Sequence, residues 1–90
     1  MATEILLYTT SHCPYCRHAK ALLASKGAAF AEIDLLEQPE KQAEMTARSG
    51  GRITVPQIFI GGVHIGGSDE LFALDAGGGL DRLLSRPEAA

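Results

Sequence analysis

No stretch of this sequence is apolar for anywhere near the roughly 20 residues that a membrane-spanning helix needs, so the sequence predicts no membrane segment. The residues from Met1 to Glu4 contain neither a basic region nor a cleavage site, which gives no sign of export and favours a cytoplasmic protein. Positive charge is scarce as well. The net charge of −3 argues against nucleic acid as the main partner, because contacts to phosphates need clustered positive charge.

Cysteine occurs only at Cys13 and Cys16. Small secreted domains that depend on disulfides usually carry more cysteines, so a disulfide-stapled fold is not favoured. A close pair in a chain without an export signal suits a reducing compartment and a catalytic or metal-binding role. A single structural disulfide is an alternative. A structural zinc site normally needs four ligands, so the two thiols would have to recruit others.

The remaining composition is that of an ordinary globular protein, with 46% apolar and 21% charged residues. A chain of 90 residues is long enough for one hydrophobic core, so the sequence predicts a single domain over residues 1–90. We expect its core to span residues 4–84 and residues 85–90 to form a frayed tail.

Apolar runs separated by glycine and proline predict an alternation of strands and helices. The predicted strands are Ile5–Tyr8, Ala28–Asp34, Gln57–Ile60 and Val63–Ile65, and the predicted helices are Pro14–Lys26, Glu40–Ser49, a helix through Leu74 with Ser68 as its N-cap, and a short turn at Leu80–Leu84. Gly61-Gly62 is a two-residue hairpin signal between the last two strands. The order βαβ-α-ββ-α belongs to the α/β class and predicts a four-stranded mixed sheet flanked by helices, with the first strand central. This arrangement is the thioredoxin fold, for which a Cys-x-x-Cys pair near a βαβ unit is typical.

The two cysteines lie at the start of the first predicted helix. Backbone N–H groups in the first turn of a helix have no partner within the helix, and the positive end of the helix dipole favours a thiolate there. We therefore expect the pKa of Cys13 to fall below the free-thiol value of about 8.5. Pro14 suits the first helical position, because its fixed φ is helical and its missing N–H would have had no partner. Two thiols at this spacing can close a disulfide, so the pair predicts a redox dithiol.

Four segments together resemble those of glutaredoxins. They are Cys13-Pro14-Tyr15-Cys16, Thr54-Val55-Pro56, Gln57-Ile58-Phe59-Ile60-Gly61-Gly62 and Gly66-Gly67-Ser68-Asp69. Thioredoxins usually have Gly-Pro between the cysteines and a tryptophan just before them, whereas this chain has no tryptophan. The resemblance covers nearly all of residues 4–84 and points to the small bacterial dithiol glutaredoxins. It implies a glutathione-dependent thiol–disulfide oxidoreductase that acts on glutathione mixed disulfides and protein disulfides, as a monomer, with glutathione as co-substrate and no permanently bound cofactor.

The resemblance also implies roles for individual residues. Cys13 would be the nucleophile and Cys16 the resolving thiol. Pro56 resembles the family's cis-proline, which sets Val55 opposite the cysteines so that its backbone can pair with glutathione. The other implied glutathione-binding residues are Tyr15, Arg48, Arg52, Thr54, Gly67, Ser68 and Asp69. We expect Pro14 and His12 to modulate Cys13.

One position departs from the pattern of the family: Thr10 stands where relatives commonly have a lysine that meets the glycine carboxylate of glutathione. Arg48 and Arg52 could bind that carboxylate, although a basic residue near a helix end also complements the helix dipole. Two further functions stay open, an iron–sulfur carrier in which two chains bridge a cluster through Cys13 and glutathione, and a redoxin supplied with electrons by thioredoxin reductase. His64 alternates with apolar strand residues, which predicts an exposed side chain.

Overall fold

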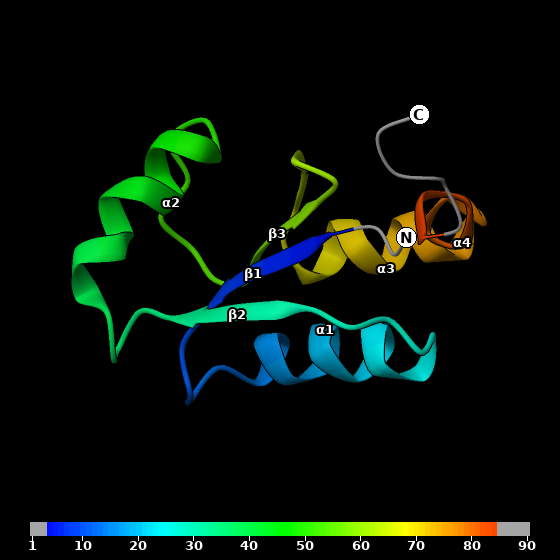
Figure 1. The fold of residues 1–90 in the computed structure, drawn as a ribbon, viewed down its shortest axis with the longest axis horizontal. Coiled ribbons are helices and arrows are strands. Elements are labelled where there is room, and N and C mark those ends of the chain that lie inside the picture. Colours follow the sequence, from blue (N-terminus) through cyan, green and yellow to red (C-terminus); the bar gives the residue numbers. More distant parts are fainter. Residues whose placement is uncertain (1–3, 85–90) are drawn as a thin grey trace.

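The computed structural model describes residues 4–84, which form one mixed sheet covered by helices on both faces (Figure 1). Its elements are β1 (Ile5–Thr9), α1 (Pro14–Ser25), β2 (Ala31–Asp34), the 3-10 turn η1 (Pro39–Lys41), α2 (Gln42–Arg48), β3 (Gln57–Ile60), β4 (Val63–Gly66), α3 (Ser68–Ala76) and α4 (Gly79–Leu84). No helix within residues 4–84 is long and apolar enough to cross a membrane. The predicted tail at residues 85–90 lies outside the described residues.

The strand order is β2-β1-β3-β4, which places β1 inside the sheet as predicted. β1 and β2 pair in parallel through the α1 crossover, whereas β3 pairs antiparallel with both β1 and β4. The hairpin predicted from Gly61-Gly62 joins β3 to β4, and both glycines have the positive φ that such a turn requires. The expected βαβ-α-ββ-α order is therefore confirmed.

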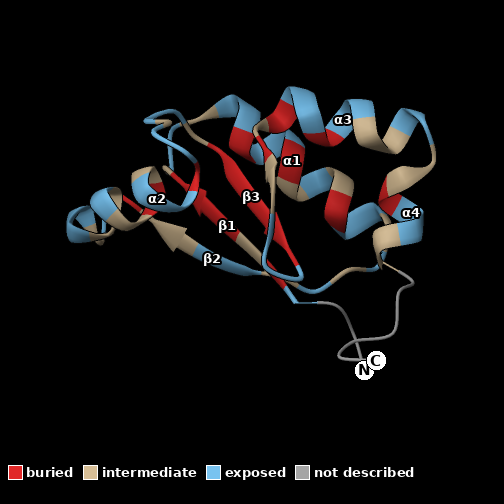
Figure 2. Ribbon diagram, turned by 90° about the horizontal axis from the view of Figure 1, so that it is seen from above, coloured by how far each residue is buried: buried red, intermediate tan, exposed pale blue. Residues whose placement is uncertain are grey.

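Two apolar layers form on the two faces of the sheet, and Figure 2 shows the buried residues concentrated on β1 and β3. On one face the sheet packs against α1, α3 and α4. α1 buries Cys16, Ala19 and Leu23, which recur at helical spacing. The buried residues of this layer are Ile5, Leu7, Ala19, Leu23, Ile58, Ile60, Leu71 and Leu80.

The opposite face is covered by α2, whose attachment combines packing with a polar contact. Met45 is fully buried against Tyr8 and Phe59 in the second apolar layer. The buried Tyr8 hydroxyl donates a hydrogen bond to the Glu44 carboxylate and accepts one from Arg48 Nη1 at 3.0 Å. Because a buried hydroxyl without partners is costly, this contact fixes α2 relative to β1.

Several predicted boundaries were wrong for local reasons. The second strand starts at Ala31 rather than Ala28. The Ala28 N–H donates a hydrogen bond to Leu23 O at 3.1 Å, so Ala28 still belongs to the turn that ends α1. Residues 39–41 form a 3-10 turn instead of the first part of a longer helix. Ser68 is the first helical residue of α3 rather than its N-cap, a position that Gly67 occupies.

Candidate active site

The two thiols differ in their surroundings although they share one turn of α1. Cys13 is the N-cap of α1, with extended backbone angles of φ −89° and ψ 115°, and Pro14 takes the first helical position. The Cys16 N–H donates a hydrogen bond to Cys13 Sγ at 3.4 Å. Cys13 is partly exposed, whereas Cys16 is 1% exposed beneath the helix, and both are free thiols. Only the first sulfur is open to an incoming disulfide.

Burial controls the ionisation of Cys16. It raises the pKa of Cys16 to about 12, partly offset by a hydrogen bond from the Thr10 backbone, and the contact with Cys13 raises it further. The pKa rises because the surroundings of the sulfur have low polarity, which disfavours the charged thiolate. At neutral pH Cys16 is therefore a thiol.

The loop before β3 faces Cys13 from the other side. The Val55–Pro56 bond is cis, which confirms the expectation for Pro56. The Cys13 thiol donates to Val55 O, with 3.7 Å between sulfur and oxygen. Cys13 therefore has a backbone N–H from α1 on one side and a backbone carbonyl from this loop on the other.

A groove of about 170 Å³ opens between this loop, the start of α1 and the first turn of α3. Its lining residues are Tyr15, Arg52, Thr54, Val55, Pro56, Gly67, Ser68, Asp69 and Glu70. The Tyr15 ring is 60% exposed and forms one wall. Eight of these nine residues were singled out in the sequence, so the structure brings most of the predicted binding set to one place.

Arg48 is the predicted binding residue that does not line this groove. Its guanidinium lies 4.6 Å from the centre of the Phe59 ring and donates to the Tyr8 hydroxyl. Arg48 belongs to the last turn of α2, which turns its side chain toward the sheet. Arg52 follows that helix in the loop and lines the groove instead.

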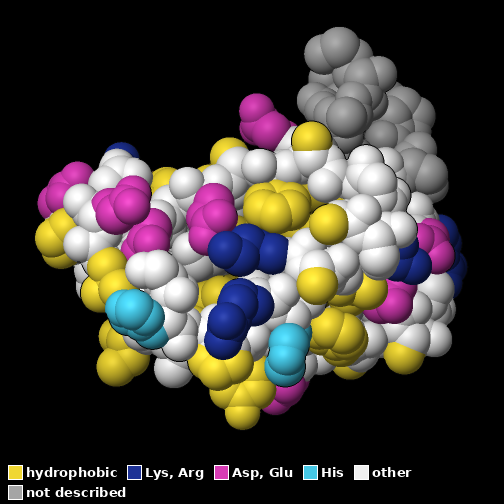
Figure 3. All heavy atoms as spheres, turned by 90° about the horizontal axis from the view of Figure 1, so that it is seen from below, with side chains coloured by type: hydrophobic (Ala, Val, Ile, Leu, Met, Phe, Trp, Pro, Cys, Tyr) yellow, Lys and Arg dark blue, Asp and Glu magenta, His cyan; other side chains and the backbone are white. Residues whose placement is uncertain are grey.

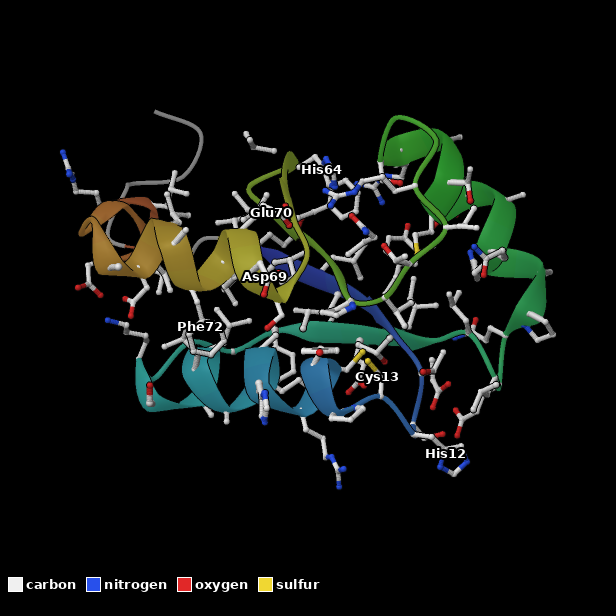
Figure 4. The ribbon with its side chains drawn as sticks, turned by 180° about the vertical axis from the view of Figure 1, so that it is seen from behind. His12, Cys13, His64, Asp69, Glu70 and Phe72 are labelled. Carbon is white, nitrogen blue, oxygen red and sulfur yellow. The ribbon has the colours of Figure 1, made fainter. Side chains whose placement is uncertain are left out.

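His12 also points away from the groove. Figure 4 shows its ring projecting outward below Cys13. The side chain is exposed. The structure therefore offers no direct contact through which His12 would act on the thiol.

Glu70 is a lining residue that sequence reasoning missed, since an acidic residue in the first turn of a helix has an adequate structural explanation. Its carboxylate accepts the Gly67 N–H at 2.6 Å and lies 3.4 Å from Arg52 Nη2. The Gly67 N–H, and secondarily Arg52, hold the pKa of Glu70 below its usual value. Gly66 makes room for this pair, because a Cβ there would lie 2.7 Å from Glu70 Oε1. The acid three residues after the N-cap was the signal that could have identified it.

His64 is half-buried rather than exposed, which corrects the expectation from strand alternation. Its Nε2 lies 2.7 Å from Gln57 Oε1, and its ring centre lies 5.0 Å from that of Phe59. Burial is the main cause that lowers the pKa of His64. Alternation failed here because Phe59 and Gln57, both on the neighbouring strand β3, cover part of the His64 ring.

Two further features of the described residues are the placement of their metal-binding side chains and the distribution of charge on the surface. Within residues 4–84, no group of three or more His, Cys, Asp or Glu side chains is placed to hold a metal ion. Figure 3 shows basic side chains near the centre of one face, with acidic side chains close to them. That face therefore carries mixed charge.

Comparison with known proteins places these features in a family. A family model described as glutaredoxin matches residues 5–65. Glutaredoxin 3 of Escherichia coli K12 is 59% identical over 81 residues, covering 90% of this chain and 96% of that protein. The solution structure of glutaredoxin from Brucella melitensis is 58% identical with a TM-score of 0.79, covering 92% of this chain and 89% of that one. The crystal structure of a buckwheat glutaredoxin–glutathione complex is 31% identical with a TM-score of 0.84, covering 92% and 77%. The predicted thioredoxin-type fold is confirmed by these structures.

The raised pKa of Cys16 predicts a distinctive alkylation profile in the Cys13→Ser protein, in which burial still acts on Cys16. Between pH 7 and 9 iodoacetamide should modify Cys16 far more slowly than it modifies Cys13 in the Cys16→Ser protein. The Cys16 rate should rise about tenfold per pH unit through pH 10 without levelling, because the thiolate is the reactive species. A Cys16 rate that levels off below pH 9, or that equals the Cys13 rate at pH 7, would contradict this picture.

Proposed function

Because the chain belongs to the glutaredoxin family, and is thus a glutathione-dependent thiol–disulfide oxidoreductase with a Cys-x-x-Cys active site, we propose that Cys13 is its nucleophile and Cys16 its resolving thiol. The observation that carries this assignment is the difference between the two sulfurs. Cys13 is partly exposed and accepts a backbone N–H, whereas burial raises the pKa of Cys16 to about 12. An exposed sulfur stabilised by a hydrogen bond is the better first nucleophile.

Glutathione mixed disulfides need only Cys13. The Cys13 thiolate attacks the glutathione sulfur, the disulfide of the substrate breaks, and the substrate leaves as a thiolate that takes up a proton. A second glutathione thiolate then attacks the glutathione sulfur bound to Cys13, which gives oxidised glutathione and regenerates the Cys13 thiolate. Both steps are exchanges between a thiolate and a disulfide, so electrons balance without another cofactor.

Protein disulfides need both thiols. Cys13 attacks one sulfur and forms a mixed disulfide with the protein. Cys16, after losing its proton, attacks Cys13 and releases the reduced protein, leaving a Cys13–Cys16 disulfide that two glutathione molecules reduce. The 3.4 Å contact between the Cys16 N–H and Cys13 Sγ supports this step, because it keeps the two residues together on one helical turn.

The groove beside Cys13 is the proposed glutathione site. The backbone of Val55 would pair with the glutathione backbone, with Thr54, Pro56 and Tyr15 forming the walls. The N-terminal turn of α3, which begins after Gly67 at Ser68, suits the γ-glutamyl carboxylate, because the positive end of the helix dipole favours an anion. The Asp69 carboxylate suits the neighbouring ammonium group. One structural relative is described as a complex with glutathione, which supports this placement.

Arg52 is the residue that we propose for the glycine carboxylate of glutathione, in the role that Thr10 cannot fill. It lines the groove and carries the only guanidinium there among the described residues. The chain would act as a single-domain monomer in the cytoplasm, with glutathionylated proteins and protein disulfides as its partners. The match to Escherichia coli glutaredoxin 3 covers 96% of that protein, which supports treating the matched residues as one domain.

Replacement of each cysteine tests the division of roles. Cys16→Ser should keep most of the glutathione-dependent reduction of a glutathionylated peptide, because Cys13 suffices for that reaction, and should lose reduction of a protein disulfide. Cys13→Ser should lose both activities. Turnover is measured with glutathione and glutathione reductase, and again with thioredoxin reductase as the electron source. Loss of both activities in Cys16→Ser, or turnover supported only by thioredoxin reductase, would overturn the assignment.

The two arginines provide a matched pair for the glutathione site. Arg52→Ala should raise the KM for a glutathionylated peptide about fivefold, since a partly exposed ion pair contributes about 1 kcal/mol. Arg48→Ala should leave that KM unchanged, because Arg48 lies over Phe59 and outside the groove. Steady-state kinetics at low salt checks both. Equal KM values for Arg52→Ala and the unmodified protein would remove Arg52 from the site.

A further inference from the structure

The loop that lines the groove is held from behind by a buried side chain. Gln57, the first residue of β3, is completely buried. Its amide nitrogen donates to Thr54 O at 3.1 Å and to Thr54 Oγ1 at 3.2 Å. Thr54 and Gln57 flank the cis Val55–Pro56 unit, so these two hydrogen bonds hold the two ends of the loop together.

The orientation of the Gln57 amide fixes the proton on His64. Thr54 O can only accept a hydrogen bond, so the nitrogen of the Gln57 amide must face the loop and its oxygen must face His64. His64 Nε2 lies 2.7 Å from Gln57 Oε1 and must therefore carry a hydrogen. The result is a directed series of hydrogen bonds, from His64 on β4 through Gln57 on β3 to Thr54 in the loop.

The surroundings of His64 favour the neutral form of its imidazole. Its ring lies against Phe59, and the charged groups that act on His64 are Arg52 and Glu70. Burial and Arg52 lower the pKa of His64, while Glu70 opposes them, so the ring is neutral at pH 7. Figure 4 shows His64 on the same side of Cys13 as Glu70 and Asp69. Glu70 and Asp69 line the groove, whereas His64 does not.

We propose that His64 and Gln57 are positioning residues for thiol–disulfide exchange, acting through Thr54 on the loop that presents Val55 to glutathione and to Cys13. The inference rests on the proposed function, because it requires that the loop bind glutathione. The Val55 carbonyl lies 3.7 Å from Cys13 Sγ, so a small displacement of the loop changes the contact at the nucleophile as well as the shape of the groove. Neither residue touches the substrate in this scheme.

Two substitutions at His64 separate the hydrogen bond from packing. His64→Phe keeps an aromatic ring against Phe59 but removes the Nε2 hydrogen, so the KM for a glutathionylated peptide should rise about two- to tenfold, the range expected for one neutral hydrogen bond. His64→Gln places an amide N–H near the position of Nε2 and should restore the KM to within about twofold of the unmodified value. In both proteins kcat should change less than KM.

Ile60→Val is the matched control on the same strand, because Ile60 is 1% exposed in the core and has no polar link to the loop. It should lower the melting temperature without changing the KM. Gln57→Met removes both ends of the series and should raise the KM at least as much as His64→Phe. If Gln57→Met does not fold, the comparison of His64→Phe with His64→Gln still decides the question.

The outcomes distinguish this inference from the proposed function. Absence of glutathione-dependent turnover in the unmodified protein would remove the proposed function. Normal turnover with the same KM in His64→Phe and the unmodified protein would overturn the positioning role alone. A KM that rises equally in His64→Phe and His64→Gln would also overturn it, because the effect would then belong to the imidazole ring and not to the Nε2 hydrogen bond.

Discussion

The hydrogen bond from the Cys16 N–H to Cys13 Sγ is the contact on which the rest of the site depends. It places one sulfur at the open end of α1 and the other sulfur one helical turn behind it, against the sheet. Helix geometry alone thereby separates an accessible thiol from a protected one. Pro14 reinforces this arrangement because it fixes the helical φ at the first position without removing a needed N–H.

The groove depends on a second constraint, which is that three separate segments meet beside Cys13. The start of α1, the loop before β3 and the first turn of α3 each contribute lining residues. The sheet holds the loop and α3 in place, since β3 and β4 are joined by a tight hairpin. Gln57 extends this support from the sheet into the loop, so the rigid part of the fold reaches the substrate-binding surface directly.

Local patterns in the sequence were sufficient for the strands, the hairpin, the helix start at the cysteines and most of the groove. They failed where a side chain has partners from distant elements. Arg48 and Arg52 look alike in sequence, but the phase of α2 turns Arg48 toward Tyr8 and leaves Arg52 at the groove. His64 looked exposed because alternation does not reveal its hydrogen bond to Gln57 across the pair of strands. Glu70 was missed since its carboxylate acts on backbone and on Arg52 from another loop.

The most direct test of the central claim is to identify which sulfur first receives glutathione. The reduced protein is mixed with oxidised glutathione, the reaction is stopped with acid within a small fraction of one turnover, and the modified cysteine is located by fragmentation mass spectrometry. The account predicts that the early adduct is on Cys13, with the Cys13–Cys16 disulfide forming afterwards. An early adduct on Cys16, or equal labelling of both sulfurs, would contradict it.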